Sequence, residues 1–126
     1  MLQQIAPERL PYEWETQVHA RNGWATAFEV PGTDAAVLVS VGVTKDTQAS
    51  ALWVEGLRGT IGRRPKQNAA LASALLDELA AMGRGLGCTE MRIEANSRVG
   101  WKTALLTKLG FELKHVGDGA VMRKAI

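Results

Sequence analysis

The chain has 126 residues, of which 46% are apolar and 22% are charged. This length and composition are typical of one globular domain with its own hydrophobic core, so we expect a single domain over residues 1–126. Fifteen basic and 13 acidic residues give a net charge of +2, which is too small to indicate a dedicated nucleic-acid-binding protein. The longest apolar stretches, such as Ala35 to Val43, are too short to span a bilayer.

The cysteine and histidine content limits which disulfides and metal sites the chain can form. Cys88 has no second cysteine with which to form an intramolecular disulfide or a zinc site. His19 and His115 are far apart and lack the spaced partners of a metal site. The N-terminal stretch has no basic region followed by an apolar one, as a secretory signal would. We therefore expect no metal, no membrane partner, and a cytoplasmic protein or one inside a virion assembled in the cytoplasm.

The first half of the chain is predicted to form a strand, a helix and three further strands. The first strand is predicted over Leu2 to Ala6. Pro7 and Pro11 delay the helix, which is predicted over Tyr12 to Arg21. The three following segments are apolar, and turn residues or a polar hairpin loop, Thr44 to Ser50, separate them. They are Trp24 to Val30, Ala36 to Val43 and Ala51 to Arg58.

The second half is predicted to alternate helices and strands. An apolar stripe at helical spacing predicts a helix over Ala69 to Arg84, with Asn68 suited to cap its N-terminus. A second helix is predicted over Ser97 to Leu109. The predicted strands of this half are Thr89 to Ala95, Phe111 to Val116 and Ala120 to Ile126. The order is β-α-β-β-β-α-β-α-β-β, which predicts an α/β fold with a mixed, twisted sheet of six to seven strands and helices on both faces.

Side-chain positions in these elements predict which residues are buried. Glu90, Arg92 and Glu94 alternate with apolar residues on one strand, and we interpret them as an exposed face with mutual charge pairs rather than a site for a cationic substrate. Cys88 is predicted to be a small buried thiol. The four tryptophans, Trp14, Trp24, Trp53 and Trp101, are assigned to the core.

Two stretches of sequence carry a resemblance to a known superfamily. Arg64-Pro65-Lys66-Gln67-Asn68-Ala69 follows a predicted strand and opens a predicted helix, and Ala95-Asn96-Ser97 leads through a helix to Lys108-Leu109-Gly110-Phe111. With the element order, these stretches resemble the GNAT (N-acetyltransferase-like) superfamily. In that family an Arg/Gln-x-x-Gly-x-Gly/Ala loop binds the pyrophosphate of coenzyme A through backbone N–H groups at the helix N-terminus.

The resemblance implies a cofactor and a set of site residues. The cofactor would be acetyl-CoA, and Glu55, the carboxylate in the strand before the loop, would deprotonate the amine substrate. Two positions depart from the family pattern: Gln67 replaces the first glycine of the loop, and Leu106 replaces a tyrosine that often acts as general acid. The residues implied in cofactor binding are Val54, Arg64, Lys66, Gln67, Asn68, Ala69, Ala70 and Asn96.

These departures leave two functions open. The first is an acyl-CoA-dependent N-acyltransferase with an eroded cofactor loop, acting on an amine of a small molecule or a protein. The second is a non-enzymatic GNAT-like internal virion protein of bacteriophages, which would act through self-association, a virion protein partner or nucleic acid. In the second case the basic run Arg58 to Lys66 would contact nucleic acid, unless it is only a solvated loop. Glu55 would then be an ordinary solvent-facing strand residue.

Overall fold

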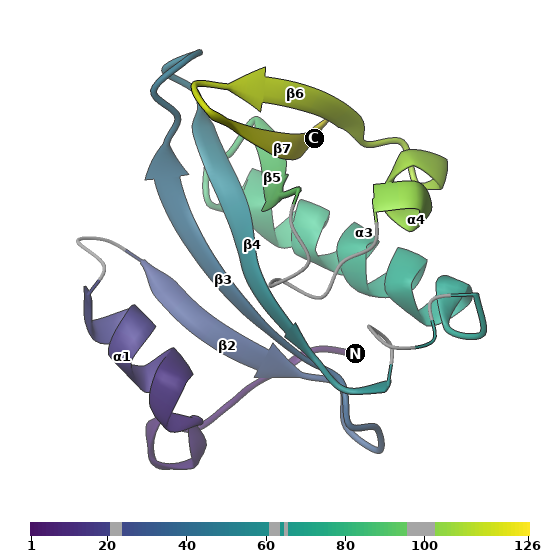
Figure 1. The fold of residues 1–126 in the computed structure, drawn as a ribbon. Helices are drawn as coiled ribbons and strands as arrows, with labels where there is room; N and C mark the ends of the chain where they lie inside the picture. Colours follow the sequence, from purple (N-terminus) through teal and green to yellow (C-terminus); the bar gives the residue numbers. More distant parts are fainter. Residues whose placement is uncertain (21–23, 61–63, 65, 96–102) are drawn as a thin grey trace.

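A computed structural model describes residues 1–20, 24–60, 64, 66–95 and 103–126, and these form an α/β fold around a mixed sheet of seven strands (Figure 1). The strands lie in the order β1-β2-β3-β4-β5-β7-β6. The strands are β1 (Gln3–Gln4), β2 (Ala25–Glu29), β3 (Ala36–Val43), β4 (Ser50–Arg58), β5 (Glu90–Glu94), β6 (Glu112–Val116) and β7 (Gly119–Ala125). The helices are the short 3-10 helix η1 (Pro7–Arg9), α1 (Tyr12–Ala20), α3 (Ala69–Gly85) and α4 (Thr103–Lys108).

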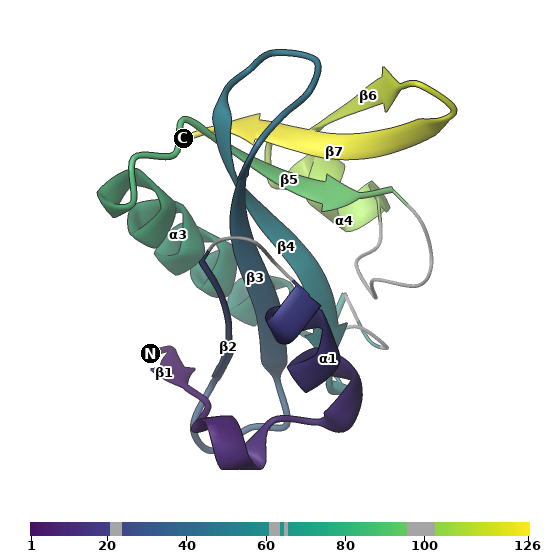
Figure 2. The same ribbon diagram turned by 90° about the vertical axis from the view of Figure 1, so that its left-hand side faces the viewer.

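The predicted fold class and element order are confirmed. Strands β4 and β5 are parallel neighbours linked through α3, and the other neighbouring strands pair antiparallel. A strand followed by a crossover helix dictates this arrangement. Helix α1 lies on one face of the sheet, and α3 and α4 lie on the other (Figures 1 and 2). Element bounds differ from the predicted ones by a few residues, and β1 is the shortest strand.

The main core lies between the sheet and α3. Leu52 and Val54 of β4 and Met91 and Ile93 of β5 are buried there. The predicted apolar stripe of α3 supplies Leu75, Leu76 and Leu79, and α4 supplies Leu106. A smaller cluster under α1 contains Ile5, Trp14, Ala27 and Leu38. The two clusters cover opposite faces of the sheet, so alternate residues of a strand enter different surroundings.

The burial predictions for Glu90, Arg92 and Trp24 are wrong. Glu90 and Arg92 are each only 1% exposed, because β4, β7 and the β3–β4 hairpin surround their strand and supply charged partners. Trp24 is 38% exposed, whereas Trp14 is buried as predicted. Trp24 precedes the first residue of β2, where the sheet does not cover it. Trp101 lies outside the described residues.

Asn68 occupies the predicted N-cap position of α3 but does not cap the helix with its side chain. Asn68 is the residue before the helix, but its side chain makes no capping hydrogen bond and its Nδ2 donates to the Arg64 carbonyl instead (2.9 Å). An N-cap residue normally has extended backbone angles. Here the chain already turns before the helix, since the Asn68 N–H also donates to the Arg64 carbonyl, and the φ and ψ of Asn68 are −115° and 17°.

Strand β4 contains a β-bulge at Glu55. Leu38 of β3 pairs with Gly56 and the adjacent Val39 pairs with Val54, so Glu55 is an extra residue in the ladder. A bulge bends its strand and increases the local twist. A Cβ atom on Gly56 would lie 3.3 Å from the Trp14 ring, so glycine lets the α1 side of the sheet pack closely at the bulge.

The turn after β4 depends on Gly59, which gives the first testable prediction. Gly59 has φ +103°, and a Cβ there would lie 2.4 Å from the Asp34 carbonyl oxygen. Gly59→Ala is therefore expected to lower the free energy of unfolding by about 2 kcal/mol or more, as measured by urea denaturation. The control is Gly85→Ala at the end of α3, where a Cβ meets nothing within 4 Å. Equal stability losses in both variants would contradict the prediction.

Candidate functional site

Strands β4 and β5 pair over a short distance and then separate. Their parallel ladder contains the pairs Ala51–Glu90, Leu52–Met91 and Trp53–Arg92. The ladder ends one residue before Val54, and the bulge at Glu55 follows at once. Because side chains alternate along a strand, Val54 points to the α3 core while its neighbours Trp53 and Glu55 point to the opposite face.

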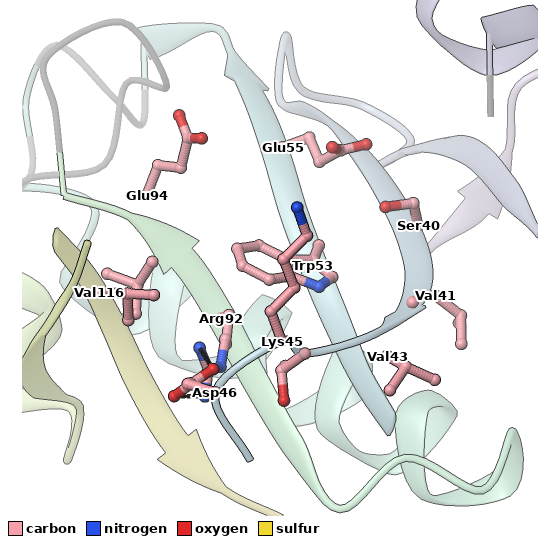
Figure 3. Close-up of a pocket in the computed structure, with 13 residues that line it drawn as sticks. Ser40, Val41, Val43, Lys45, Asp46, Trp53, Glu55, Arg92, Glu94 and Val116 are labelled. Atoms are coloured by element: carbon pink, nitrogen blue, oxygen red, sulfur yellow. Dashed lines mark hydrogen bonds and ion pairs between the residues drawn. The ribbon is translucent and has the colours of Figure 1, made fainter. Parts of the chain in front are cut away.

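On that opposite face lies a pocket of about 650 Å³ (Figure 3). The strands on both sides of the separation and the hairpin between β3 and β4 form its walls. It is lined by Ser40, Val41, Gly42, Val43, Thr44, Lys45, Asp46, Trp53, Glu55, Arg92, Glu94, Val116 and Val121.

A network of ion pairs closes one end of this pocket. The Asp46 carboxylate accepts two hydrogen bonds from the Arg92 guanidinium, each 2.9 Å, and a third contact of 2.9 Å from Lys114 Nζ of β6. Arg92 also donates its Nε–H to Glu90 Oε1 at 3.1 Å, and Arg123 of β7 pairs with the other oxygen of Glu90. The network joins the β3–β4 hairpin to β5, β6 and β7, and we call it the charge network.

The charge network shifts the pKa values of Asp46 and Arg92. Hydrogen bonds from Arg92 and then from Lys114 hold the pKa of Asp46 far below its ordinary value of 3.8. Burial opposes the charged form of Arg92, but the hydrogen bond to Asp46 and the charge of Glu90 outweigh it, so the pKa of Arg92 is raised. Asp46 is therefore ionised, and its oxygens already accept hydrogen bonds, so it is a poor proton acceptor at neutral pH.

The other end of the pocket is acidic and aromatic. Glu55 is half-buried, Glu94 is exposed, and the half-buried ring of Trp53 lies between the two strands that carry them (Figure 3). The Arg92 guanidinium lies 5.9 Å from the centre of the Trp53 ring. Two carboxylates beside an aromatic surface favour a cationic group such as an ammonium ion. A carboxylate at this position can also accept a proton from that ammonium ion.

The structure brings only part of the predicted site together. Of the residues predicted for the site, Glu55 lines the pocket and Val54 lies where the strands separate. The predicted phosphate-binding residues are at the start of α3 and do not line this pocket. Among them Arg64, Lys66, Gln67 and Ala70 are exposed, while Asn68 and Ala69 are half-buried. Asn96 lies outside the described residues.

The start of α3 has features that fit an anionic group. Its first turn contains no acidic residue, Ala70 is exposed, and the side chains of Arg64 and Lys66 are also exposed. The first N–H groups of a helix have no partner within the helix and favour negative charge. The Asn68 N–H is less available, because it donates to the Arg64 carbonyl at 3.2 Å. The residues present therefore fit a phosphate at the first turn of the helix itself.

Sequence reasoning missed most residues of the pocket, and three of them bear directly on its chemistry. Lys45 and Asp46 are in a polar hairpin loop, and nothing in their local sequence indicates that this loop reaches β5 and β6. Trp53 was assigned to the core, but it is half-buried and lines the pocket. Its alternation with Glu55 on β4 was the available signal, since residues two apart share a face of a strand.

The remaining residues considered in the sequence do not line the pocket. Cys88 is buried as predicted, and burial raises the pKa of its thiol. Leu106 is fully buried in the main core. His19 and His115 are on the surface. Within the described residues, no group of three or more His, Cys, Asp or Glu side chains is placed to hold a metal ion, and no helix is long and apolar enough to cross a membrane.

The fold is similar to that of solved acetyltransferases. No family model and no curated protein matches the sequence. A GNAT-family acetyltransferase from Listeria monocytogenes is 11% identical with a TM-score of 0.59, over 91% of this chain and 70% of that one. An IAA acetyltransferase from Bacillus cereus is 13% identical with a TM-score of 0.61, over 100% of this chain and 97% of that one. A mutant AtaT toxin, solved with the C-terminus of the antitoxin AtaR and acetyl-CoA, is 11% identical with a TM-score of 0.59, over 99% and 92% of the two chains. The chain therefore has the fold of the GNAT acetyltransferases.

Proposed function

We propose that the protein is an acyl-CoA-dependent N-acyltransferase. The observation that carries this proposal is the coincidence of three features: β4 bulges at Glu55, β4 leaves β5 at the same place, and a pocket with that carboxylate opens there. The AtaT structure supports it further, because a protein of this fold was solved with acetyl-CoA.

The acyl donor would bind through the strand separation and the start of α3. Arg64, Lys66 and the first turn of α3 (Gln67, Asn68, Ala69 and Ala70) would hold its phosphates, and Val54 and Asn96 remain the other residues proposed to bind the cofactor. When bound, acetyl-CoA supplies an acyl group on a thioester. Gln67 in place of glycine keeps the backbone farther from the phosphates, so we expect weaker binding than a glycine loop allows.

The acceptor amine would occupy the acidic end of the pocket. Glu94 and the Trp53 ring attract and orient an ammonium ion, and Glu55 accepts its proton directly or through water, which leaves a nucleophilic amine. The charge network holds the hairpin wall in place. Leu106 is buried and has no proton to give, so this chain offers no side-chain acid at the position where the family often has tyrosine.

Titration with acetyl-CoA tests this function. Binding to the folded state raises the melting temperature by mass action, with about 2.7 kcal/mol of stabilisation at a ligand concentration 100 times the Kd. Ala70→Asp is expected to abolish the shift, because it places a negative charge at the proposed phosphate site. The same charge suits a helix N-terminus, so the variant should remain folded. Ala74→Asp, one turn later and also exposed, is the matched control and should bind normally. No shift at millimolar acetyl-CoA would contradict the proposal.

The same titration addresses the second function open from the sequence, a non-enzymatic bacteriophage virion protein. Arg58 pairs with the exposed Glu13 carboxylate and lies 5.1 Å from the centre of the Trp14 ring, so nucleic acid would have to compete with Glu13 for it. Arg58, Arg64 and Lys66 are the exposed cations of that run among the described residues. Binding of DNA without binding of acetyl-CoA would favour the virion protein.

A further inference from the structure

The pocket already contains an amine of the protein itself. Lys45 belongs to the β3–β4 hairpin, lines the pocket, and extends its side chain across it in the direction of Glu55 (Figure 3). Within the described part of the chain, no acceptor lies within hydrogen-bond distance of its Nζ. Two other lysines differ in this respect: Lys114 pairs with Asp46, and Lys124 donates to the Leu109 carbonyl.

Both neighbours of Lys45 are held in place. Asp46 is bound by Arg92 and Lys114. The Thr44 backbone N–H donates to the Ala49 carbonyl at 2.8 Å, and its hydroxyl lies 2.6 Å from the Thr47 hydroxyl. The hairpin therefore keeps the backbone of Lys45 at the edge of the pocket. A group held near a reacting centre reacts as if it were present at a very high concentration.

We propose that Lys45 is an auto-acylation site, so that the protein transfers an acyl group from acyl-CoA to Lys45 Nζ. This inference rests on the proposed acyltransferase function. Glu55 takes one proton from the Lys45 ammonium, and the neutral amine attacks the thioester carbonyl. The C–N bond forms and the C–S bond breaks, the nitrogen loses its second proton to the leaving sulfur, and Glu55 returns its proton to solvent. The products are an Nε-acyl-lysine, free coenzyme A and one proton.

Acylation would change the charge of the acceptor site. The Lys45 ammonium partly neutralises the end of the pocket that contains Glu55 and Glu94, and it competes there with a cationic acceptor. The acylated side chain is neutral. Auto-acylation would therefore strengthen the attraction of the two carboxylates for an external ammonium ion, and the neutral variant Lys45→Gln is expected to lower the KM for a cationic amine.

Mass spectrometry tests the proposal. Incubation with acetyl-CoA and no added amine is expected to add one acetyl group per chain, located on Lys45 by peptide mapping, at least ~10-fold faster than on exposed lysines. The rate per molecule should not depend on protein concentration. Lys45→Arg and Glu55→Gln should each remove the modification. Lys108→Arg, an exposed lysine of α4 on the other face of the sheet, should leave it intact.

Two further results distinguish a failure of the auto-acylation proposal from a failure of the acyltransferase proposal. Equal acetylation of Lys45 and Lys108, or transfer to an external amine with no change at Lys45, would overturn the auto-acylation site and leave the acyltransferase function standing. No acetyl-CoA binding and no transfer to any amine would overturn both.

Discussion

Replacing Glu55 with Gln is expected to lower the turnover of acyl transfer to an external amine by about 10²-fold or more. The amide keeps the size of the side chain but cannot accept the proton of an ammonium ion at neutral pH. The position matters, because Glu55 is the bulged residue of β4 at the point where the strand leaves β5 and faces the pocket. The measurement is a steady-state assay of free coenzyme A at saturating amine and acetyl-CoA.

The matched control for this prediction is Glu94→Gln. Glu94 faces the same pocket from β5, and the substitution removes the same charge. If Glu94 only attracts the ammonium ion, its loss raises the KM for a cationic amine and leaves kcat within a few fold. A collapse of kcat in Glu94→Gln with normal turnover in Glu55→Gln would identify Glu94 of β5, and not Glu55, as the general base. A normal kcat in both variants would show that neither carboxylate acts as the general base.

The order of elements could be predicted because it depends on local patterns. The stripe of leucines in α3 has helical spacing, and β5 alternates apolar and charged residues. A crossover helix between two strands then fixes their parallel pairing. Glu55 could be chosen as a candidate for a similar reason, since it is the one carboxylate in an otherwise apolar strand before the proposed phosphate loop.

The remaining features depend on contacts between distant segments, and local patterns do not encode them. The bulge at Glu55 exists only relative to β3, and the pocket exists only because a polar hairpin reaches β5 and β6. Glu90 and Arg92 show the same difficulty. An alternating charged strand suggests an exposed face, but here charged partners from the β3–β4 hairpin and β7 allow both charges to be buried.

Removing Arg92 is expected to have the largest effect on stability. Arg92 is 1% exposed and pairs with Asp46 and with Glu90, which is also 1% exposed. Truncating one member of a buried ion pair leaves the other charge uncompensated and typically costs about 3–5 kcal/mol. Glu90 keeps its contact with Arg123, so we expect Arg92→Met to lower the free energy of unfolding by about 3 kcal/mol. Urea denaturation at neutral pH measures this value.

The matched control is Arg9→Met, the same substitution in a two-hydrogen-bond pair with Glu29 at the surface. Exposed ion pairs contribute little to the free energy of unfolding, so the urea midpoint of Arg9→Met should scarcely change. Acid titration adds a second test. The folded pKa of Asp46 lies below its unfolded value, so its contribution to stability is present above the unfolded pKa and is lost as the pH falls through the acidic range. Arg92 is the main cause of that lowered pKa, and Arg92→Met should therefore lose less stability than the wild type on acidification. Equal losses on acidification, or equal shifts in Arg92→Met and Arg9→Met at neutral pH, would show that the charge network does not hold the hairpin.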